Sequence, residues 1–204
     1  MRIASHARAD QRGFTLAEFL VAIALVGLIM TGLLTLMMTS NQTYLTGSNQ
    51  IEAQQAARVA LARMVREIRG AGYNPKGALC LPVTNCPIVG APGKGGLDST
   101  ALMIQNDTDN DGVFEATEHI AYTLNGTDLQ RQDFAVDAAP QTIVGGIQWL
   151  EFKYLDQNGV ETKKVEDVRS VQISLTTQPE NLPGIWQTGR VSVTMSDRIR
   201  LRNR

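Results

Sequence analysis

The sequence predicts an α+β protein in which one long N-terminal helix packs on a head domain built around an antiparallel β-sheet. Three observations carry this prediction. Residues 14–38 form an apolar run of 25 residues, long enough to span a bilayer as a helix, which takes roughly 20. Residues 39–70 continue with apolar positions at helical spacing. From residue 101 onward, short strand-like runs alternate with turns rich in Asn and Gly, as in antiparallel sheets.

The composition excludes two classes of protein. The chain has 204 residues, a formal net charge of −1 and 43% hydrophobic residues. A polyanion-binding protein would carry a strong basic excess, and a disordered acidic protein would contain far fewer apolar residues. The length fits one ordinary domain with an additional terminal segment.

The N-terminus indicates a basic leader that is removed ahead of the apolar run. Residues 1–13 carry three arginines and one aspartate. A secretory signal has an apolar core of about 7–15 residues followed by a small-residue cleavage site, whereas this run is longer and no such site follows it. A plain membrane anchor explains the length of the run but not Glu18, which is the one charged residue within 14–38. A charged side chain in hydrocarbon costs roughly 2.5–3.5 kcal/mol. A leader cut before the run explains both features.

The stretch from Gly13 to Glu18, together with the apolar run, closely resembles the N-terminus of type IV pilins and type II secretion pseudopilins. The resemblance implies that a prepilin peptidase cuts between Gly13 and Phe14 and N-methylates Phe14. It also implies that Glu18 helps a subunit enter a filament by meeting the positive N-terminus of a neighbour. A buried carboxylate is tolerated when a cation pairs with it, and an α-amine of pKa about 8 is mostly charged at neutral pH.

Later segments resemble the PilW family of minor pilins. They are residues 41–44, 60–69, 71–75, 152–156, 168–173 and 200–203. The secretion pseudopilin called the J subunit is a relative, and the sequence of residues 69–73 favours the pilus branch. Many major pilins have a proline near the middle of the membrane helix, and its absence from 14–38 suits a low-copy subunit. The implied partners are other minor and major pilins, the prepilin peptidase and the inner-membrane assembly machinery.

Three functions remain open from the sequence. The first is a minor pilin that enters or primes the type IV pilus, the second a type II secretion pseudopilin, and the third a calcium-dependent tip adhesin. The arginines of the leader place the N-terminus in the cytoplasm, so the head is expected in the periplasm and then on the pilus. Sequence motifs for catalysis are missing, so an enzyme is not expected.

The expected boundaries are a leader at 1–13, a transmembrane or fibre-core helix at 14–38, its amphipathic continuation at 39–70 and a β-rich head at 71–204. Gly70 and the residues after it are expected to end the helix. The face expected to pack on the head consists of Ala53, Ala57, Leu61, Met64, Val65 and Ile68.

The head is expected to form one largely antiparallel sheet with the helix covering one face. The expected strands are 101–106, 119–124, 128–134 and 147–155, followed by two alternating runs around 171–175 and 191–195. The pair Asn125-Gly126 predicts a tight hairpin between the second and third of these strands.

Residues 107–118 match the twelve-residue calcium loop D-x-D-x-D-G-x5-E. Oxygen ligands at loop positions 1, 3, 5, 7, 9 and 12 would surround one Ca²⁺, with an affinity in the weak extracellular range of about 10⁻⁴–10⁻³ M. These positions are Asp107, Asp109, Asp111, the carbonyl of Val113, Glu115 and Glu118. The alternative is a solvated acidic loop, because strands rather than helices are expected on both sides.

Cys80 and Cys86 are the two cysteines of the chain, and outside the cytoplasm one disulfide between them is expected. A metal site would need two further ligands nearby, and the sequence offers none.

The C-terminal run 198–204 alternates basic and apolar residues, which fits a charged edge strand. A nucleic-acid strip is disfavoured because aromatic residues are not interleaved.

Overall fold

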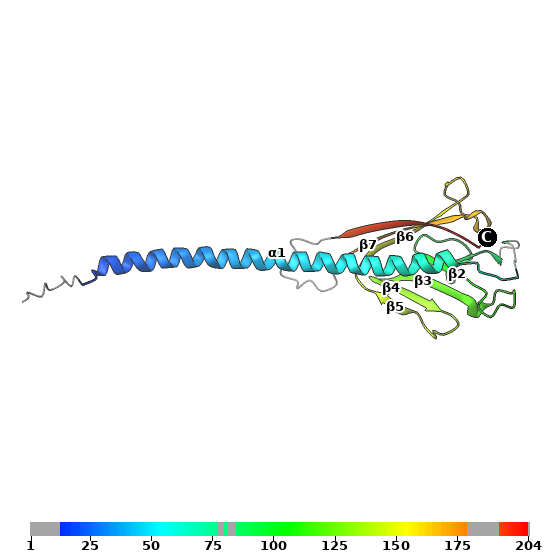
Figure 1. Ribbon diagram of the computed structural model, residues 1–204, viewed down its shortest axis with the longest axis horizontal. Coiled ribbons are helices and arrows are strands. Elements are labelled where there is room, and N and C mark those ends of the chain that lie inside the picture. The colour runs from blue at the N-terminus through cyan, green and yellow to red at the C-terminus, as the bar shows by residue number, and fades with distance from the viewer. Residues whose placement is uncertain (1–12, 77–79, 81–84, 179–191, 204) are drawn as a thin grey trace, which may run out of the picture. The chain divides into compact units, whose positions relative to one another are not determined.

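The computed structural model describes residues 13–76, 80, 85–178 and 192–203 (Figure 1). Internal contacts divide the chain into two compact units, Met1–Leu45 and Thr46–Arg204. One long helix and two antiparallel sheets make up the described secondary structure, together with two single 3-10 turns. The predicted α+β class, a long N-terminal helix packed on an antiparallel head, is therefore confirmed.

Helix α1 runs from Leu16–Gly70 without interruption over 55 residues. It starts slightly later than the apolar run, because Gly13, Phe14 and Thr15 are not helical. The buried face of the helix consists of Ala53, Ala57, Ala60, Met64 and Ile68. Leu61 and Val65 were expected on this face but are only partly buried. Ala60, which was not among the expected residues, is fully buried, because it lies three residues after Ala57 and four before Met64 and so shares their helical face.

The head holds two sheets, so the expectation of a single sheet was wrong. The described residues form a five-stranded sheet in the order β1-β2-β3-β4-β5 and a three-stranded sheet in the order β6-β7-β8, and every pairing is antiparallel. The first contains β1 (Ile88–Gly90), β2 (Ala101–Gln105), β3 (His119–Asn125), β4 (Asp128–Asp133) and β5 (Gln141–Val144). The second contains β6 (Ile147–Leu155), β7 (Ser170–Thr177) and β8 (Val193–Arg200).

Two glycines between β5 and β6 separate the sheets. Gly146 has a φ of 72°, a left-handed conformation that favours glycine. The chain turns there, and the amide of Ile147 donates to the carbonyl of Thr127 at 2.8 Å. Ile147 then pairs with Thr177 of β7 instead of extending the first sheet. The predicted hairpin at Asn125-Gly126 is confirmed by the pairing of β3 with β4.

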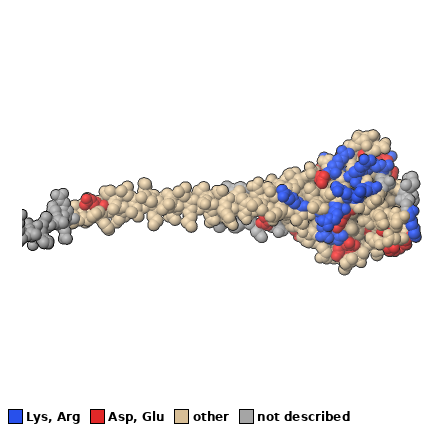
Figure 2. Space-filling view, viewed as in Figure 1, with Lys and Arg blue, Asp and Glu red and all other residues tan. Residues whose placement is uncertain are grey.

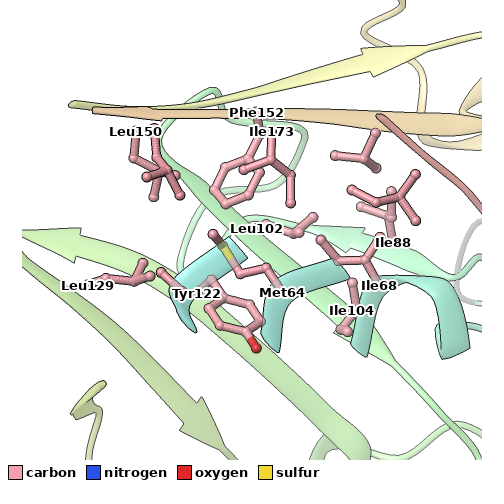
Figure 3. Packing of buried hydrophobic residues seen from close by; sticks show 14 of the residues in the cluster. Met64, Ile68, Ile88, Leu102, Ile104, Tyr122, Leu129, Leu150, Phe152 and Ile173 are labelled. Atoms are coloured by element: carbon pink, nitrogen blue, oxygen red, sulfur yellow. The ribbon is translucent and has the colours of Figure 1, made fainter. Parts of the chain in front are cut away.

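The amphipathic part of α1 and both sheets share one hydrophobic core (Figure 3). Met64 and Ile68 of the helix lie between side chains that come from the two sheets. Those labelled in Figure 3 are Leu102, Ile104, Tyr122 and Leu129 from the first sheet, Leu150, Phe152 and Ile173 from the second, and Ile88 from the short strand β1. Met64 and Ile68 thus contribute to a core that both sheets share.

A half-buried ionic cluster ties α1 to the first sheet. The Tyr122 hydroxyl donates to Glu67 Oε2 at 2.6 Å, and Arg131 Nε donates to the same oxygen at 3.1 Å. Arg131 also pairs with Asp133 and Asp137 at 3.0 and 3.7 Å. Burial, and after it the hydrogen bond to Glu67, raise the pKa of Tyr122 well above its usual range, so Tyr122 remains a donor. One guanidinium therefore contacts three carboxylates.

The helix ends against two distant parts of the chain. Asn203 Nδ2 donates to the carbonyl of Gly70 at 2.9 Å, which satisfies an acceptor at the helix C-terminus. The amide of Gly72 donates to the carbonyl of Gln105 at 2.8 Å. Gly72 has a φ of 76°, and a Cβ there would lie 2.5 Å from both Asn203 O and Pro87 Cγ. Residue 72, two positions after the end of the helix, must therefore be glycine for both conformational and steric reasons.

We expect Gly72→Ala to lower the free energy of unfolding by about 2–4 kcal/mol, because it adds backbone strain and a clash with the Asn203 carbonyl and the Pro87 ring. Gly70→Ala is the matched control, since a Cβ at Gly70 meets nothing within 4 Å. It should stay within about 1 kcal/mol of wild type. Urea unfolding of the full chain in detergent, followed by tryptophan fluorescence, measures both. Equal effects of the two changes would contradict this account of the helix end.

We expect Arg131→Met to cost about 3–5 kcal/mol, because it leaves three carboxylates without their buried cation. Arg63 also pairs with Glu67, at 3.5 Å, but its side chain is 45% exposed against 12% for Arg131. Arg63→Met should therefore cost less than about 1 kcal/mol. The same unfolding assay compares the two variants, and a larger loss for Arg63→Met would show that the exposed pair dominates.

Candidate functional site

The first candidate site is the start of α1. Gly13, Phe14 and Thr15 precede the helix, and Glu18 lies in its first turn. The amide and the hydroxyl of Thr15 donate to Glu18 Oε2 at 3.0 and 2.8 Å, and the amide of Glu18 donates back to Thr15 Oγ1 at 3.3 Å. This is a capping box, in which Thr15 and Glu18 satisfy amides that the helix leaves unpaired. The leader residues 1–12 lie outside the described residues.

Sequence reasoning missed Thr15 as the partner of Glu18. The signal was present, because Thr-x-x-Glu ahead of an apolar run is the pattern of a capping box. In this structure the carboxylate of Glu18 thus holds the start of its own helix. Both hydrogen bonds from Thr15 go to one oxygen, Oε2.

The apolar part of α1 exposes its side chains all around. Its large residues are 53–79% exposed between Phe14 and Met38. An 18-residue window has a mean hydropathy of 2.6, and none of it is buried against other parts of the chain. Among the described helices, this one is long and apolar enough to cross a membrane. Such a surface is stable in lipid or against other apolar helices but not in water.

Four threonines along α1, two of them within residues 14–38, satisfy the hydrogen-bonding capacity of their own hydroxyl groups. Each Oγ1 donates to the carbonyl four residues earlier at 2.8–3.0 Å. The four are Thr31, Thr35, Thr39 and Thr43. An unpaired hydroxyl group in hydrocarbon would be energetically costly. These hydrogen bonds within the helix therefore make the four threonines compatible with an apolar environment.

The second candidate site is the acidic loop between β2 and β3. Asp107, Asp109 and Glu118 each bring one carboxylate oxygen to within 4.8 Å of the others. Asp107 is 1% exposed and Glu118 is 6% exposed, whereas Asp109 is exposed. The two remaining acidic residues of the motif, Asp111 and Glu115, are exposed and lie outside this group. The structure thus brings together three of the five carboxylates that the sequence singled out.

Backbone amides organise the loop around its acidic side chains. Gly112, with a φ of 90°, donates to Asp107 Oδ2 at 2.9 Å. Asp109 Oδ1 accepts from the amide of Asp111 at 3.0 Å, and Asp111 Oδ1 accepts from the amide of Val113 at 2.7 Å. The carbonyl of Val113, expected at loop position 7, belongs to an exposed residue. The loop is therefore folded around its carboxylates rather than extended into solvent.

Glu118 closes the loop from a single 3-10 turn, Ala116–Glu118. Burial alone would raise the pKa of its carboxyl. Hydrogen bonds from the amides of Thr108, Glu115 and Asp109 and from the Thr108 hydroxyl outweigh burial and lower the pKa of Glu118. Glu118 is therefore an anion held in place by neutral donors.

Cys80 and Cys86 form a disulfide, as predicted, with their Cα atoms 4.2 Å apart. Cys86 is fully buried beside Val165. The residues between Cys80 and Asn85 lie outside the described residues. The bridge closes a short loop directly before β1.

Basic side chains gather on the visible face of the head, whereas the N-terminal helix segment carries almost no charge (Figure 2). A cleft on the head is lined by Ala62, Val65, Arg66, Arg69, Gly70, Tyr73, Arg202 and Asn203. Arg69 stands in the last turn of α1, where cations are favourable to the helix dipole. Strand β8, with its basic residues, is the edge of the three-stranded sheet, in line with the predicted edge strand.

One protein family matches part of the chain. Residues 8–34 match the family described as the prokaryotic N-terminal methylation motif. A search of curated proteins found no match. The matched residues include Gly13, Phe14 and Glu18 and reach into the exposed apolar part of α1. The chain therefore carries a prepilin-type N-terminal methylation motif at the start of an apolar helix. This motif supports a structural pilin or pseudopilin of the type IV pilus or type II secretion class, and not an enzyme.

Proposed function

We propose that the chain is a minor pilin of a type IV pilus, of the PilW family, that is processed between Gly13 and Phe14 and then enters or primes the fibre. The observation that carries the proposal is the junction at which the methylation motif leads directly into a fully exposed apolar helix. Before assembly, residues 14–38 hold the protein in the inner membrane with the head in the periplasm. Its partners are other pilins, the prepilin peptidase and the inner-membrane assembly machinery.

The apolar helix suits both lipid and the interior of a fibre. Its side chains require an apolar surrounding, and a bundle of similar helices supplies one as well as lipid does. The transfer from membrane to fibre then exposes no new apolar surface to water. The threonine hydroxyls, which bond to their own helix, need no partner in either place.

Glu18 is the residue of this segment whose charge can pair with a neighbouring subunit in the fibre. Its carboxylate is held by Thr15 at the helix start, and it still has acceptor capacity for a cation. The N-methylated amine of Phe14 on a neighbouring subunit is a cation that fits an apolar fibre core. Pairing of the two charges removes the cost of leaving either alone there.

Glu18→Gln is the sharpest test of the pairing. Glutamine preserves the capping box but carries no charge. We expect the variant to be processed and inserted into the membrane like wild type, while its incorporation into sheared pili falls roughly tenfold or more, the effect of about 1.4 kcal/mol. Glu18→Ala removes both the cap and the charge and should be at least as defective.

Glu52→Gln is the matched control, because Glu52 is an exposed carboxylate further along the same helix. Immunoblots of membrane and pilus fractions from the three strains compare insertion with incorporation. Normal incorporation of Glu18→Gln would exclude charge pairing and leave Glu18 with its capping role alone.

A deletion strain separates the three candidate functions. A minor pilin predicts that surface pili are lost or reduced while protein secretion stays normal. Normal pili with exoproteins retained in the periplasm would instead identify a secretion pseudopilin. Normal pilus numbers with lost attachment would identify a tip adhesin. Electron microscopy of pili, a secretion assay and an attachment assay on the same strain decide among them, and complementation with the wild-type gene is the control.

A further inference from the structure

We propose that Asp107, Asp109 and Glu118 bind one Ca²⁺, and that the ion fastens the acidic loop to the chain segment that follows α1. The inference goes beyond the proposed function and does not depend on it. It rests on an unpaired buried oxygen, on the spacing of three carboxylates and on the contacts of the loop with residues 73–76.

The unpaired oxygen is Oδ1 of Asp107. This side chain is 1% exposed, and its other oxygen, Oδ2, accepts a hydrogen bond from Gly112. Oδ1 is buried and has no hydrogen-bond partner among the described residues. Burying an unpaired carboxylate oxygen is strongly unfavourable. A bound cation removes this penalty.

The spacing of the carboxylates fits an ion of the size of calcium. Oxygens bound to one Ca²⁺ at about 2.3–2.6 Å can be at most about 5 Å apart. The three oxygens from Asp107, Asp109 and Glu118 lie within 4.8 Å of one another. All three donors are hard carboxylate oxygens, which suit Ca²⁺ and do not favour zinc or copper. Asp111 and Glu115 lie outside this group, so water must complete the shell and the affinity should be modest.

The loop is tied to the segment directly after the helix. The amide of Asp107 donates to the carbonyl of Tyr73 at 2.8 Å, and Asn74 Nδ2 donates to the carbonyl of Gly112 at 3.1 Å. The ammonium of Lys76 donates to the carbonyl of Asp111. A cation that orders the loop must therefore also order the chain after α1, where the helix meets the first sheet.

The test is thermal unfolding of the EDTA-treated full chain in detergent, with and without about 10 mM CaCl₂. At a dissociation constant of about 10⁻⁴–10⁻³ M, we expect the unfolding midpoint to rise by on the order of 5 °C. The same concentration of MgCl₂ should give a much smaller rise, because Mg²⁺ keeps its waters and requires a tighter octahedral site. No shift with calcium, or an equal shift with magnesium, would overturn the assignment.

Asp107→Asn distinguishes binding from folding. Asparagine can still accept the hydrogen bond from Gly112, and its amide can donate to neighbouring carboxylates, so the ion-free midpoint should not fall. The rise of the unfolding midpoint with calcium should disappear in this variant.

Asp109→Asn changes an exposed residue and should weaken calcium binding roughly tenfold without unfolding the protein. Glu161→Gln removes an exposed carboxylate far from the loop in sequence and should behave like wild type. A full calcium shift in Asp107→Asn would overturn the proposal.

Amide hydrogen exchange tests the fastening. Calcium should slow exchange both in residues 107–118 and in residues 72–76, because the two segments are bonded to each other. Protection of the loop alone would overturn the second half of the proposal while leaving the ion site in place. Asp107→Asn is again the control, since it should show the same exchange with and without calcium.

Discussion

One helix must satisfy two different surroundings, and the rest of the structure depends on how it does so. The apolar residues up to Met38 cover every side of α1 and require lipid or other helices around them. Beyond this part, the buried residues are confined to one stripe from Ala53 to Ile68. Side chains from both sheets pack in one core with this stripe. The head is thus organised by the half of the helix that shows a single apolar face.

The C-terminal end of α1 is where separate parts of the head meet. Asn203 donates to the last carbonyl of the helix, Gly72 bonds to the end of β2, and the acidic loop bonds to Tyr73. The cluster of Glu67 and Arg131 adds an ionic contact one turn earlier. A force or a conformational change that acts on the helix therefore reaches the first sheet, the chain terminus and the acidic loop through a few neighbouring residues.

Much of the fold could be predicted from local patterns. Strand β6 has the predicted bounds, and Asn125-Gly126 closes the predicted hairpin, because turn chemistry and alternation act over a few residues. The division into two sheets could not be predicted, since it depends on how Ile147 pairs after the turn at Gly146. In the same way, the motif identified the acidic loop, but the unpaired oxygen of Asp107 and the contacts with Lys76 arise only from tertiary packing.

The proposed mature protein begins at Phe14 and keeps the apolar segment 14–38 after the leader is removed. Intact-mass and N-terminal peptide mass spectrometry of the protein purified from its native membrane test this most directly. We expect a mature chain that starts at Phe14, lacks residues 1–13 and carries one methyl group on its α-amine. A chain that retains the leader, or one cut after the apolar run, would contradict it.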